Sequence, residues 1–248
     1  MPIKLTPARG MMSATATDVP AFPGVGFGLG IPESIGDVAR PVWFGKVTPE
    51  WRELEAGAWE TSATSEGELS YRAVLTPTDD TVEIRLSLSN LSDRVWGSSL
   101  AFNCFGAGGA PDLADHECVR HWVGWNGELR RLIEVPRQYS PRPAVALWSV
   151  EGAPPGAELS FVSNFRATPP GVALEGWLAI VARDGKRLVA TASKPTLFLF
   201  QNMEYSCIHA SPGFGRLEPG QIGEATNVIY FVESTLEDWH ARMKGELG

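Results

Sequence analysis

Apolar and polar side chains alternate from Thr81 to Ser89 in TVEIRLSLSN, the segment Thr81–Asn90. Valine, isoleucine or leucine stands at every second position from Val82 to Leu88, with charged residues and serines between them. Successive side chains of an extended strand point to opposite faces, so this segment has one apolar face and one polar face. That pattern is typical of antiparallel sheets, which bury one face and expose the other. The segment therefore predicts a half-buried antiparallel strand.

Further strand-like segments recur at short spacing along the chain. Leu69–Leu75 precedes the alternating strand across the turn Pro77–Asp80, where proline presets φ and aspartate bonds its own backbone. Asp184-Gly185 is a strong hairpin signal because it supplies positive φ at little cost. The other predicted strands are Ser98–Cys104, Cys118–Gly124, Glu128–Glu134, Ala144–Val150, Glu158–Val162, Val172–Ala182, Arg187–Ala192, Thr196–Gln201 and Gly223–Glu233.

Roughly ten to twelve strands in one body predict an all-β protein with a large antiparallel β-sandwich. Strand lengths vary and the loops are uneven, which favours a sandwich over a regular barrel. No repeat or composition break divides the 248 residues, so we expect one domain, 1–248. Residues 1–40 are rich in Gly, Pro, Ala and Thr and have weak periodicity, so they are predicted to form an irregular N-terminal arm.

Only the C-terminus carries a convincing helix signal. Ser234 followed by Glu237 reads as a capping box. Leu236, Trp239 and Met243 then form an apolar stripe that would dock on the sandwich. One short C-terminal helix, 235–245, is expected.

Glycine alternates with other residues over Gly24–Gly30. The G-x-G-x-x-G dinucleotide fingerprint fails, because Ile31 stands in place of the third glycine and no strand–helix context follows. The segment instead indicates a glycine-faced strand or loop beneath a bulky neighbour.

Charge and cysteine content exclude several classes of function. The net charge is −8 and the 21 lysines and arginines are scattered, which argues against nucleic-acid binding and against an anionic membrane surface. Three cysteines without a C-x-x-C pair argue against a disulfide framework and against a finger-type zinc site. No apolar signal segment or membrane-length run is present, so the protein is expected to be cytoplasmic, although a signal peptide removed beforehand would leave the same sequence.

The stretch YRAVLTPTDDTVEIRLSLSNLSDRVW resembles the supersandwich of galactose-mutarotase-like proteins and related polysaccharide-lyase domains. The ending C-I-H-x-S-P-x-F-G-x-L-x-P-G also resembles uncharacterised bacterial sandwich proteins found beside carbohydrate metabolism. The resemblance spans about Tyr71 to Glu246 as a pattern. It implies a fold and a carbohydrate partner, but no catalytic residue can be carried over, since no position matches a mutarotase's histidine or glutamate.

His209 is the first candidate catalytic residue. It stands between an aromatic run and the Gly/Pro-rich stretch Ser211–Gly215, which reads as a loop. Cys207 and His209 would share one face of a strand, with Ile208 on the other. The ring could act as a general acid or base. Alternatively, it could pin the following loop through backbone hydrogen bonds.

The segment Pro111–Trp122 gathers two histidines, three acidic residues and a cysteine after a Gly-rich loop. His116, His121 and His209 could bind a divalent metal. Against this, a five-residue separation in an extended strand puts two rings on opposite faces. No other cofactor is suggested.

Several further side chains are candidates for sugar chemistry, in which a carboxylate usually acts beside a second acid–base group. An arginine can hold a uronic carboxylate through two hydrogen bonds. An exposed tryptophan can stack on a sugar ring, although most tryptophans of sandwiches are core. The candidate catalytic residues beside His209 are Glu204, His121 and Tyr139; the candidate substrate-binding residues are Trp125, Trp122, Arg137 and Arg120.

Three functions compete on this reading. The favoured one is an enzyme acting on a sugar or oligosaccharide as a lyase, epimerase or hydrolase. The second is a non-catalytic carbohydrate-binding sandwich, with exposed aromatics but no convergent histidine and glutamate. The third is a structural or assembly protein that forms a homo-oligomer and has no pocket.

Overall fold

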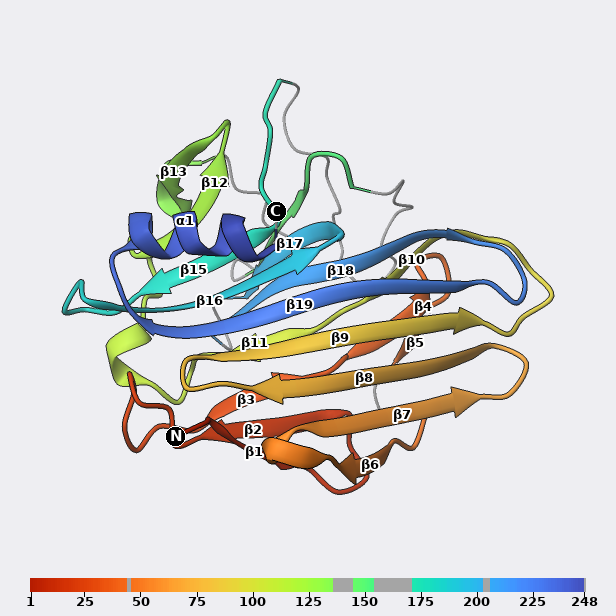
Figure 1. Ribbon diagram of the computed structural model, residues 1–248. Coiled ribbons are helices and arrows are strands. Elements are labelled where there is room, and N and C mark those ends of the chain that lie inside the picture. The colour runs from red at the N-terminus through yellow and green to blue at the C-terminus, as the bar shows by residue number, and fades with distance from the viewer. Residues whose placement is uncertain (44–45, 136–144, 154–170, 203–205, 248) are drawn as a thin grey trace.

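The computed structural model describes residues 1–43, 46–135, 145–153, 171–202 and 206–247. Two antiparallel sheets pack face to face as a sandwich, and one α-helix of the described chain lies across the outer face of one sheet (Figure 1). The fold class predicted from the alternating segments is therefore confirmed. No helix among the described residues has the length and apolar character that a membrane span requires.

The first sheet has ten strands in the order β1-β2-β3-β11-β18-β10-β4-β5, with β14 and β17 joined beside β18. Its strands are β1 (Lys4–Pro7), β2 (Ser13–Thr17), β3 (Phe27–Gly30), β4 (Ser34–Asp37), β5 (Val42–Trp43), β10 (Trp96–Ala101), β11 (Cys104–Gly106), β14 (Val145–Ser149), β17 (Thr196–Asn202) and β18 (Cys207–Leu217).

The second sheet has nine strands in the order β13-β12-β15-β16-β19-β9-β8-β7-β6. They are β6 (Glu50–Glu53), β7 (Trp59–Ser65), β8 (Leu69–Pro77), β9 (Thr81–Asn90), β12 (His121–Trp125), β13 (Glu128–Arg131), β15 (Trp177–Val181), β16 (Arg187–Lys194) and β19 (Ile222–Glu233). Three short 3-10 turns, η1 (Glu55–Gly57), η2 (Pro111–Leu113) and η3 (Leu132–Glu134), lie between strands.

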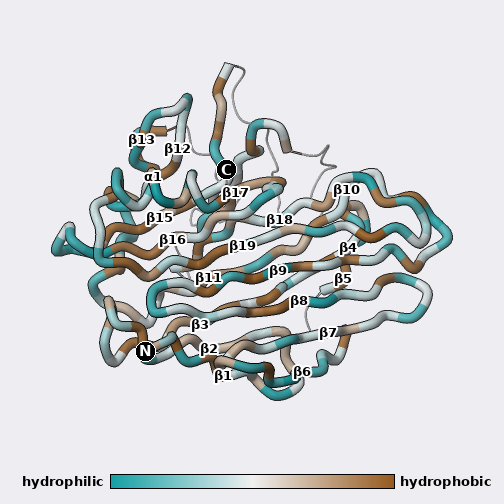
Figure 2. The backbone as a smooth tube through the Cα atoms, viewed as in Figure 1, coloured by the Kyte–Doolittle hydropathy of each residue, from teal (hydrophilic) through white to brown (hydrophobic). Residues whose placement is uncertain are grey.

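The alternating segment becomes β9, in the middle of the nine-stranded sheet. Val82, Ile84, Leu86 and Leu88 are all buried between the sheets, as the pattern predicts. Figure 2 shows hydrophobic and hydrophilic residues alternating along the strands, with hydrophilic residues gathered in the turns at the strand ends.

The N-terminal arm predicted for residues 1–40 is wrong in one respect: the segment is not irregular. It forms β1 to β4, four strands of four or five residues each. Their inward positions carry Leu5, Ala14, Phe27 and Leu29, which join the main core. Such short strands, with glycine on the outward positions of β3, are too brief to produce a clear hydrophobic period.

The stretch Ser211–Gly215, expected to be a loop, is also strand, because β18 continues to Leu217. Pro212 pairs with Thr196 at a register shift, so its missing N–H interrupts the ladder only locally. Gly213 lies so close to Leu197 that a Cβ would sit 2.9 Å from the leucine Cβ. Glycine here is explained by a close backbone approach and not by a turn.

The predicted C-terminal helix is present as α1 (Leu236–Leu247), and its stripe of Leu236, Trp239 and Met243 is buried. The cap differs from the prediction by one residue. The Thr235 hydroxyl accepts a hydrogen bond from the Asp238 N–H at 3.1 Å and donates to the Asp238 carboxylate at 2.8 Å. Threonine and aspartate therefore close the first turn in place of the expected serine and glutamate.

Candidate functional site

Strand pairing lines up two rows of small and polar residues across the outer face of the ten-stranded sheet. Ser13 of β2 pairs with Gly30 of β3, which pairs with Cys104 of β11. The second row runs Thr15, Gly28, Gly106 and Cys207, the last on β18. The intervening residues of these strands, such as Leu29, Phe105 and Ile208, enter the main core. The two rows therefore point away from the sandwich interior.

A hollow of about 560 Å³, here called the outer trough, lies over these rows. It is lined by Met11, Ser13, Ala14, Thr15, Gly28, Leu29, Gly30, Glu33, Trp43, Cys104 and Gly106. Glycine creates the depression, since a Cβ added at Gly28 would meet nothing within 4 Å. At Gly30 a Cβ would lie 3.2 Å from both the Cys104 Cβ and the Glu33 Cγ, so glycine lets those two side chains approach each other.

A cluster of two thiols and an imidazole lies at the Cys104 end of the trough. The ligand-type atoms of Cys104, Cys207 and His209 all lie within 4.8 Å of one another. Cys104 is half-buried and lines the trough, while Cys207 and His209 are buried behind it. The prediction that Cys207 and His209 share a face of their strand is confirmed.

The surroundings of His209 fix its ring in place. Its Nδ1–H donates to the Asn103 carbonyl at 2.8 Å, which leaves Nε2 facing the Cys207 sulfur at 3.3 Å. Phe102 stacks on the ring with centroids 4.4 Å apart, and Phe200 packs edge-on at 4.9 Å. Only 1% of His209 is exposed, so the ring reaches the trough only by way of the two thiols.

Neighbouring groups set the charge of this cluster. A hydrogen bond from Cys104 and the adjacent imidazole hold the pKa of Cys207 well below its ordinary value, in spite of burial. Burial alone would lower the pKa of His209, but the Cys207 thiolate outweighs it and raises that pKa. The hydrogen bond with Cys207, burial and the nearby Glu33 raise the pKa of Cys104. The neighbours of Cys207 thus favour its thiolate form, while the thiol of Cys104 faces the trough.

His121, predicted to be catalytic, lies on β12 in the other sheet and is buried. Its Nδ1–H donates to the Asp115 carboxylate at 2.8 Å. Asp115 also accepts hydrogen bonds from the backbone N–H groups of Val119 and Arg120. Burial opposes the ionised form of Asp115, but the bonds from His121 and Arg120 prevail and lower its pKa. The Asp115–His121 pair therefore holds the loop between these two residues in place.

The remaining predicted residues do not gather around His209. Arg120 donates to the backbone carbonyls of Asp112, Val181 and Ala114. Trp122 is half-buried beneath the Arg131 guanidinium. Trp125, a predicted substrate-binding residue, ends β12 and packs partly buried against the main core. Glu204, Tyr139 and Arg137 lie outside the described residues.

The predicted metal set of His116, His121 and His209 is not assembled. His116 is exposed in a loop and His121 is bonded to Asp115, while His209 belongs to the opposite sheet. Within the part of the chain that the structure describes, the ligand cluster that forms is Cys104, Cys207 and His209. Sequence reasoning missed Cys104 and Glu33, because only the pairing of β3, β11 and β18 brings them beside the C-x-H motif.

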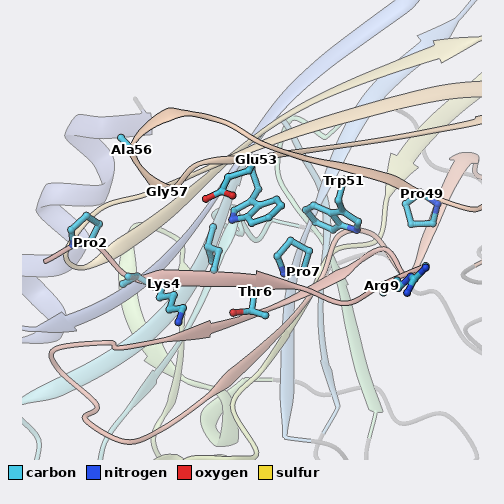
Figure 3. A pocket seen from close by; sticks show the side chains of 14 residues that line it. Pro2, Lys4, Thr6, Pro7, Arg9, Pro49, Trp51, Glu53, Ala56 and Gly57 are labelled. Carbon is cyan, nitrogen blue, oxygen red and sulfur yellow. The ribbon is translucent and has the colours of Figure 1, made fainter.

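A larger hollow of about 870 Å³, here called the edge groove, lies where β1 and β6 approach each other (Figure 3). Proline, aliphatic and tryptophan side chains dominate its lining, and Lys4, Arg9 and Glu53 are its charged residues. Trp51 is half-buried there, and its indole N–H donates to the Met11 carbonyl at 2.9 Å. No histidine or cysteine lines this groove, so the larger hollow lacks the reactive groups of the smaller one.

Comparison with known proteins gives a fold and no sequence relative. No family profile matches the sequence, and no curated protein matches it. A galactose mutarotase-like protein from Clostridium acetobutylicum superposes with a TM-score of 0.51 at 10% identity, covering 92% of this chain and 94% of that chain.

Two further solved structures superpose less closely. A galactose mutarotase related enzyme from Lactobacillus acidophilus has a TM-score of 0.49 at 9% identity, covering 94% and 98% of the two chains. A putative aldose 1-epimerase from Escherichia coli K12 has a TM-score of 0.45 at 8% identity, covering 93% and 99%. The protein has the galactose mutarotase-like fold, as the resemblance in its sequence implied.

Proposed function

We propose that the protein is an enzyme that binds one sugar ring in the outer trough and moves protons on it, in an epimerase-type reaction. Glu33 is the acid–base group that faces the sugar. His209 is the second group, connected to the trough through the thiols of Cys207 and Cys104. The observation that carries this proposal is the convergence of a carboxylate, two thiols and an imidazole at one end of a glycine-floored hollow.

The lining of the trough suits a sugar. Trp43 is half-buried and offers an aromatic wall, against which the C–H face of a sugar ring can pack. Ser13 and Thr15 supply hydroxyls, and the bare backbone around Gly28 lets a ring come close to the sheet. A volume of about 560 Å³ is within the usual range for small-molecule sites.

The choice of epimerisation over hydrolysis rests on the count of carboxylates. Most glycosidases use two carboxyl groups that flank the scissile bond. Among the described residues that line the trough, Glu33 is the only carboxylate. Proton transfer to and from a sugar oxygen or carbon needs one such group and a partner of different chemistry. The likeness to a galactose mutarotase-like protein supports the same choice.

The test is NMR of the purified protein with a panel of monosaccharides and uronic acids, including exchange between anomers. Gly28→Leu is the decisive variant, because a Cβ at this position would meet nothing within 4 Å and the side chain would project into the trough. Gly97→Leu is the matched control, an exposed glycine of the same sheet that also has open space around it.

We expect exchange catalysed by the wild type and by Gly97→Leu, and loss of it in Gly28→Leu at unchanged thermal stability. Equal activity in both leucine variants would refute the trough as the site. Absence of any change across the panel with folded wild type would remove the enzymatic proposal.

A second candidate, non-catalytic carbohydrate binding, is favoured by the edge groove. Trp51 and Trp59 are both half-buried there and could stack on an oligosaccharide. On that alternative, sugars bind without new NMR signals, and Trp51→Ala weakens binding while Gly28→Leu leaves it unchanged.

A further inference from the structure

We propose that Cys104, Cys207 and His209 bind a zinc-class divalent ion at the inner end of the outer trough, with the open coordination position facing Glu33. The ion can bind whether or not a sugar is the substrate, but where it binds it replaces His209 as the partner of Glu33 in the proposed function.

The spacing of the three ligand atoms fits a tetrahedral ion. Zinc bonds of about 2.3 Å to sulfur and about 2.0 Å to nitrogen place tetrahedral ligand atoms roughly 3.5–3.8 Å apart. The three atoms here lie within 4.8 Å of one another, and the His209 Nε2 is 3.3 Å from the Cys207 sulfur. Shifts of up to about 1 Å, within the reach of side-chain rotation, would bring them to bonding positions.

The imidazole is already oriented as a metal ligand. Ligating histidines commonly donate the other ring N–H to a carbonyl or carboxylate, which fixes the tautomer and aims the free lone pair at the metal. His209 does this through its bond to the Asn103 carbonyl at 2.8 Å. The stacked Phe102 and the edge-on Phe200 hold the ring and form a dry wall around the cluster.

Charge and access also suit the ion. Two thiolates and a neutral imidazole neutralise a divalent cation, which makes the buried site electrically balanced. Soft sulfur ligands with one imidazole favour zinc over the oxygen-seeking magnesium and calcium. Cys104 lines the trough, so an ion could enter from there, and Glu33 or a water molecule could complete its coordination.

A bound ion would change the roles within the site. The cysteines and His209 would hold the metal instead of protons, and Glu33 alone would exchange protons with a ligand. The ion would supply a Lewis acid opposite that carboxylate, able to polarise an oxygen of whatever lies in the trough.

The test uses reduced full-length protein prepared without chelator or metal-affinity chromatography. Elemental analysis measures the metal that copurifies, and Co²⁺ titration of the metal-free protein reports thiolate ligation through charge-transfer absorption. We expect one ion per chain and a Co²⁺ signal that saturates at one equivalent. Cys207→Ala should abolish both.

Cys118→Ala is the matched control, since Cys118 is a buried cysteine of the main core outside the cluster and its removal should leave both readouts intact. Cys104→Ser provides a second variant at a half-buried position, where folding is less at risk. Zn²⁺ should raise the melting temperature of the wild type but not that of Cys104→Ser.

Three results would overturn the proposal. The first is folded, reduced wild type that gives no thiolate–cobalt absorption. The second is a signal that persists in Cys207→Ala. The third is an intact mass that has lost two hydrogens under reducing conditions, which would identify a Cys104–Cys207 disulfide instead of a metal site.

Discussion

The outer faces of the two sheets differ in what covers them. On the nine-stranded sheet, α1 covers the surface with Leu236, Trp239 and Met243, and Trp239 packs edge-on against Trp177 and Tyr230. On the ten-stranded sheet, glycines at the outward positions of β3 and β11 leave the backbone bare beneath the outer trough. The outer face of the ten-stranded sheet also carries a buried apolar cluster with Phe102 and Phe200 beside His209, so the contrast is between α1 and the part of that face formed by β2, β3 and β11.

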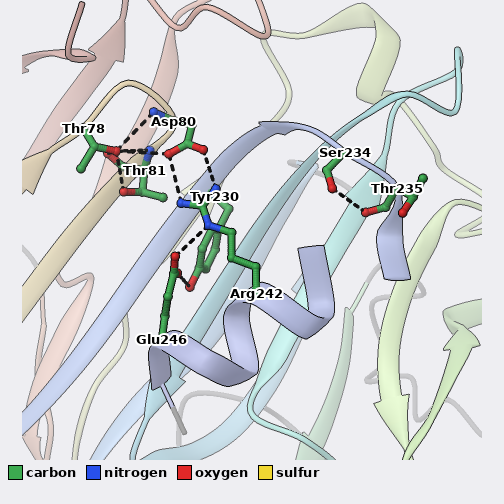
Figure 4. A network of polar contacts seen from close by, with 8 residues as sticks. All are labelled: Thr78, Asp80, Thr81, Tyr230, Ser234, Thr235, Arg242 and Glu246. Atoms are coloured by element: carbon green, nitrogen blue, oxygen red, sulfur yellow. Dashed lines mark hydrogen bonds and ion pairs between the residues drawn. The ribbon is translucent and has the colours of Figure 1, made fainter. Parts of the chain in front are cut away.

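The polar groups follow the same division. Beneath α1, Arg242 bonds Asp80 and Glu246, and Glu246 accepts from the Tyr230 hydroxyl (Figure 4), whereas the buried Trp239 indole N–H has no hydrogen-bond partner among the described residues. In the outer trough, Glu33 and Cys104 line open space. We therefore expect substitutions in the trough to alter activity at constant stability. Substitutions beneath α1 should lower stability and leave activity per folded molecule unchanged.

The largest effect is expected from Glu33→Gln. Removing a general acid–base group typically lowers turnover by about 10²- to 10⁴-fold, and amide for carboxylate keeps the shape of this half-buried side chain. Glu246→Gln is the matched change beneath α1 and should leave turnover unchanged. Sugar exchange measured by NMR, with melting curves for each variant, checks both. Equal turnover in the two variants would contradict the assignment of Glu33.

The next largest effect concerns stability and falls on the other face. Trp239→Ala removes a tryptophan that is 1% exposed, and a truncation of that kind costs about 3–5 kcal/mol. Urea unfolding should show this loss, while activity per folded molecule stays constant because the trough is on the other sheet. Trp239→Phe should recover much of the stability. A fall in specific activity as large as the fall in stability would show that the two faces are coupled.

Sequence patterns predicted the nine-stranded sheet and α1 better than the ten-stranded sheet. Val82 to Leu88 alternate because one face of β9 is core and the other is not, and the stripe on α1 follows from the same cause. The strands β1 to β4 escaped detection because they are short and because Gly28 and Gly30 occupy outward positions that a binding surface leaves bare.

The sequence allowed only part of the candidate site to be predicted, for a related reason. A cysteine and a histidine two residues apart on one strand share a face, so Cys207 and His209 could be paired from sequence alone. Cys104 joins them through the register of β11 and β18, and Glu33 through the turn after β3, where its N–H bonds the Phe102 carbonyl; local patterns encode neither. Two histidines close together in Pro111–Trp122 suggested a second site. The structure instead bonds His121 to Asp115 of the same segment.

A smaller effect on binding is expected from Trp43→Ala. Loss of one aromatic contact is worth about 0.5–1.5 kcal/mol beyond area burial, which corresponds to roughly a twofold to thirteenfold weaker affinity for a sugar in the trough. Trp51→Ala in the edge groove is the matched control and should leave that affinity unchanged. NMR titration with the best ligand of the panel measures both. A larger loss in Trp51→Ala would move the sugar site to the edge groove.

The smallest effect is the acid sensitivity of the bond between Asp80 and Arg242. A hydrogen bond from Arg242 is the main cause that lowers the pKa of Asp80. The stabilisation is therefore complete above the unfolded-state pKa of about 3.9 and is lost as the pH falls through the lower folded-state value. Both side chains are 39% exposed, so solvent limits the contribution to less than about 1 kcal/mol.

Urea midpoints of the wild type and Asp80→Asn, measured from about pH 7 down to about pH 2, test this linkage. The variant should be less stable near neutral pH, and the gap should close in acid as the wild-type carboxylate is protonated. Asp93→Asn, a change at an exposed residue outside this network, is the matched control. A gap that stays constant across this range would mean that Asp80 stabilises α1 by packing and not by its charge, and the polar network beneath the helix would then be incidental to the covering of that face.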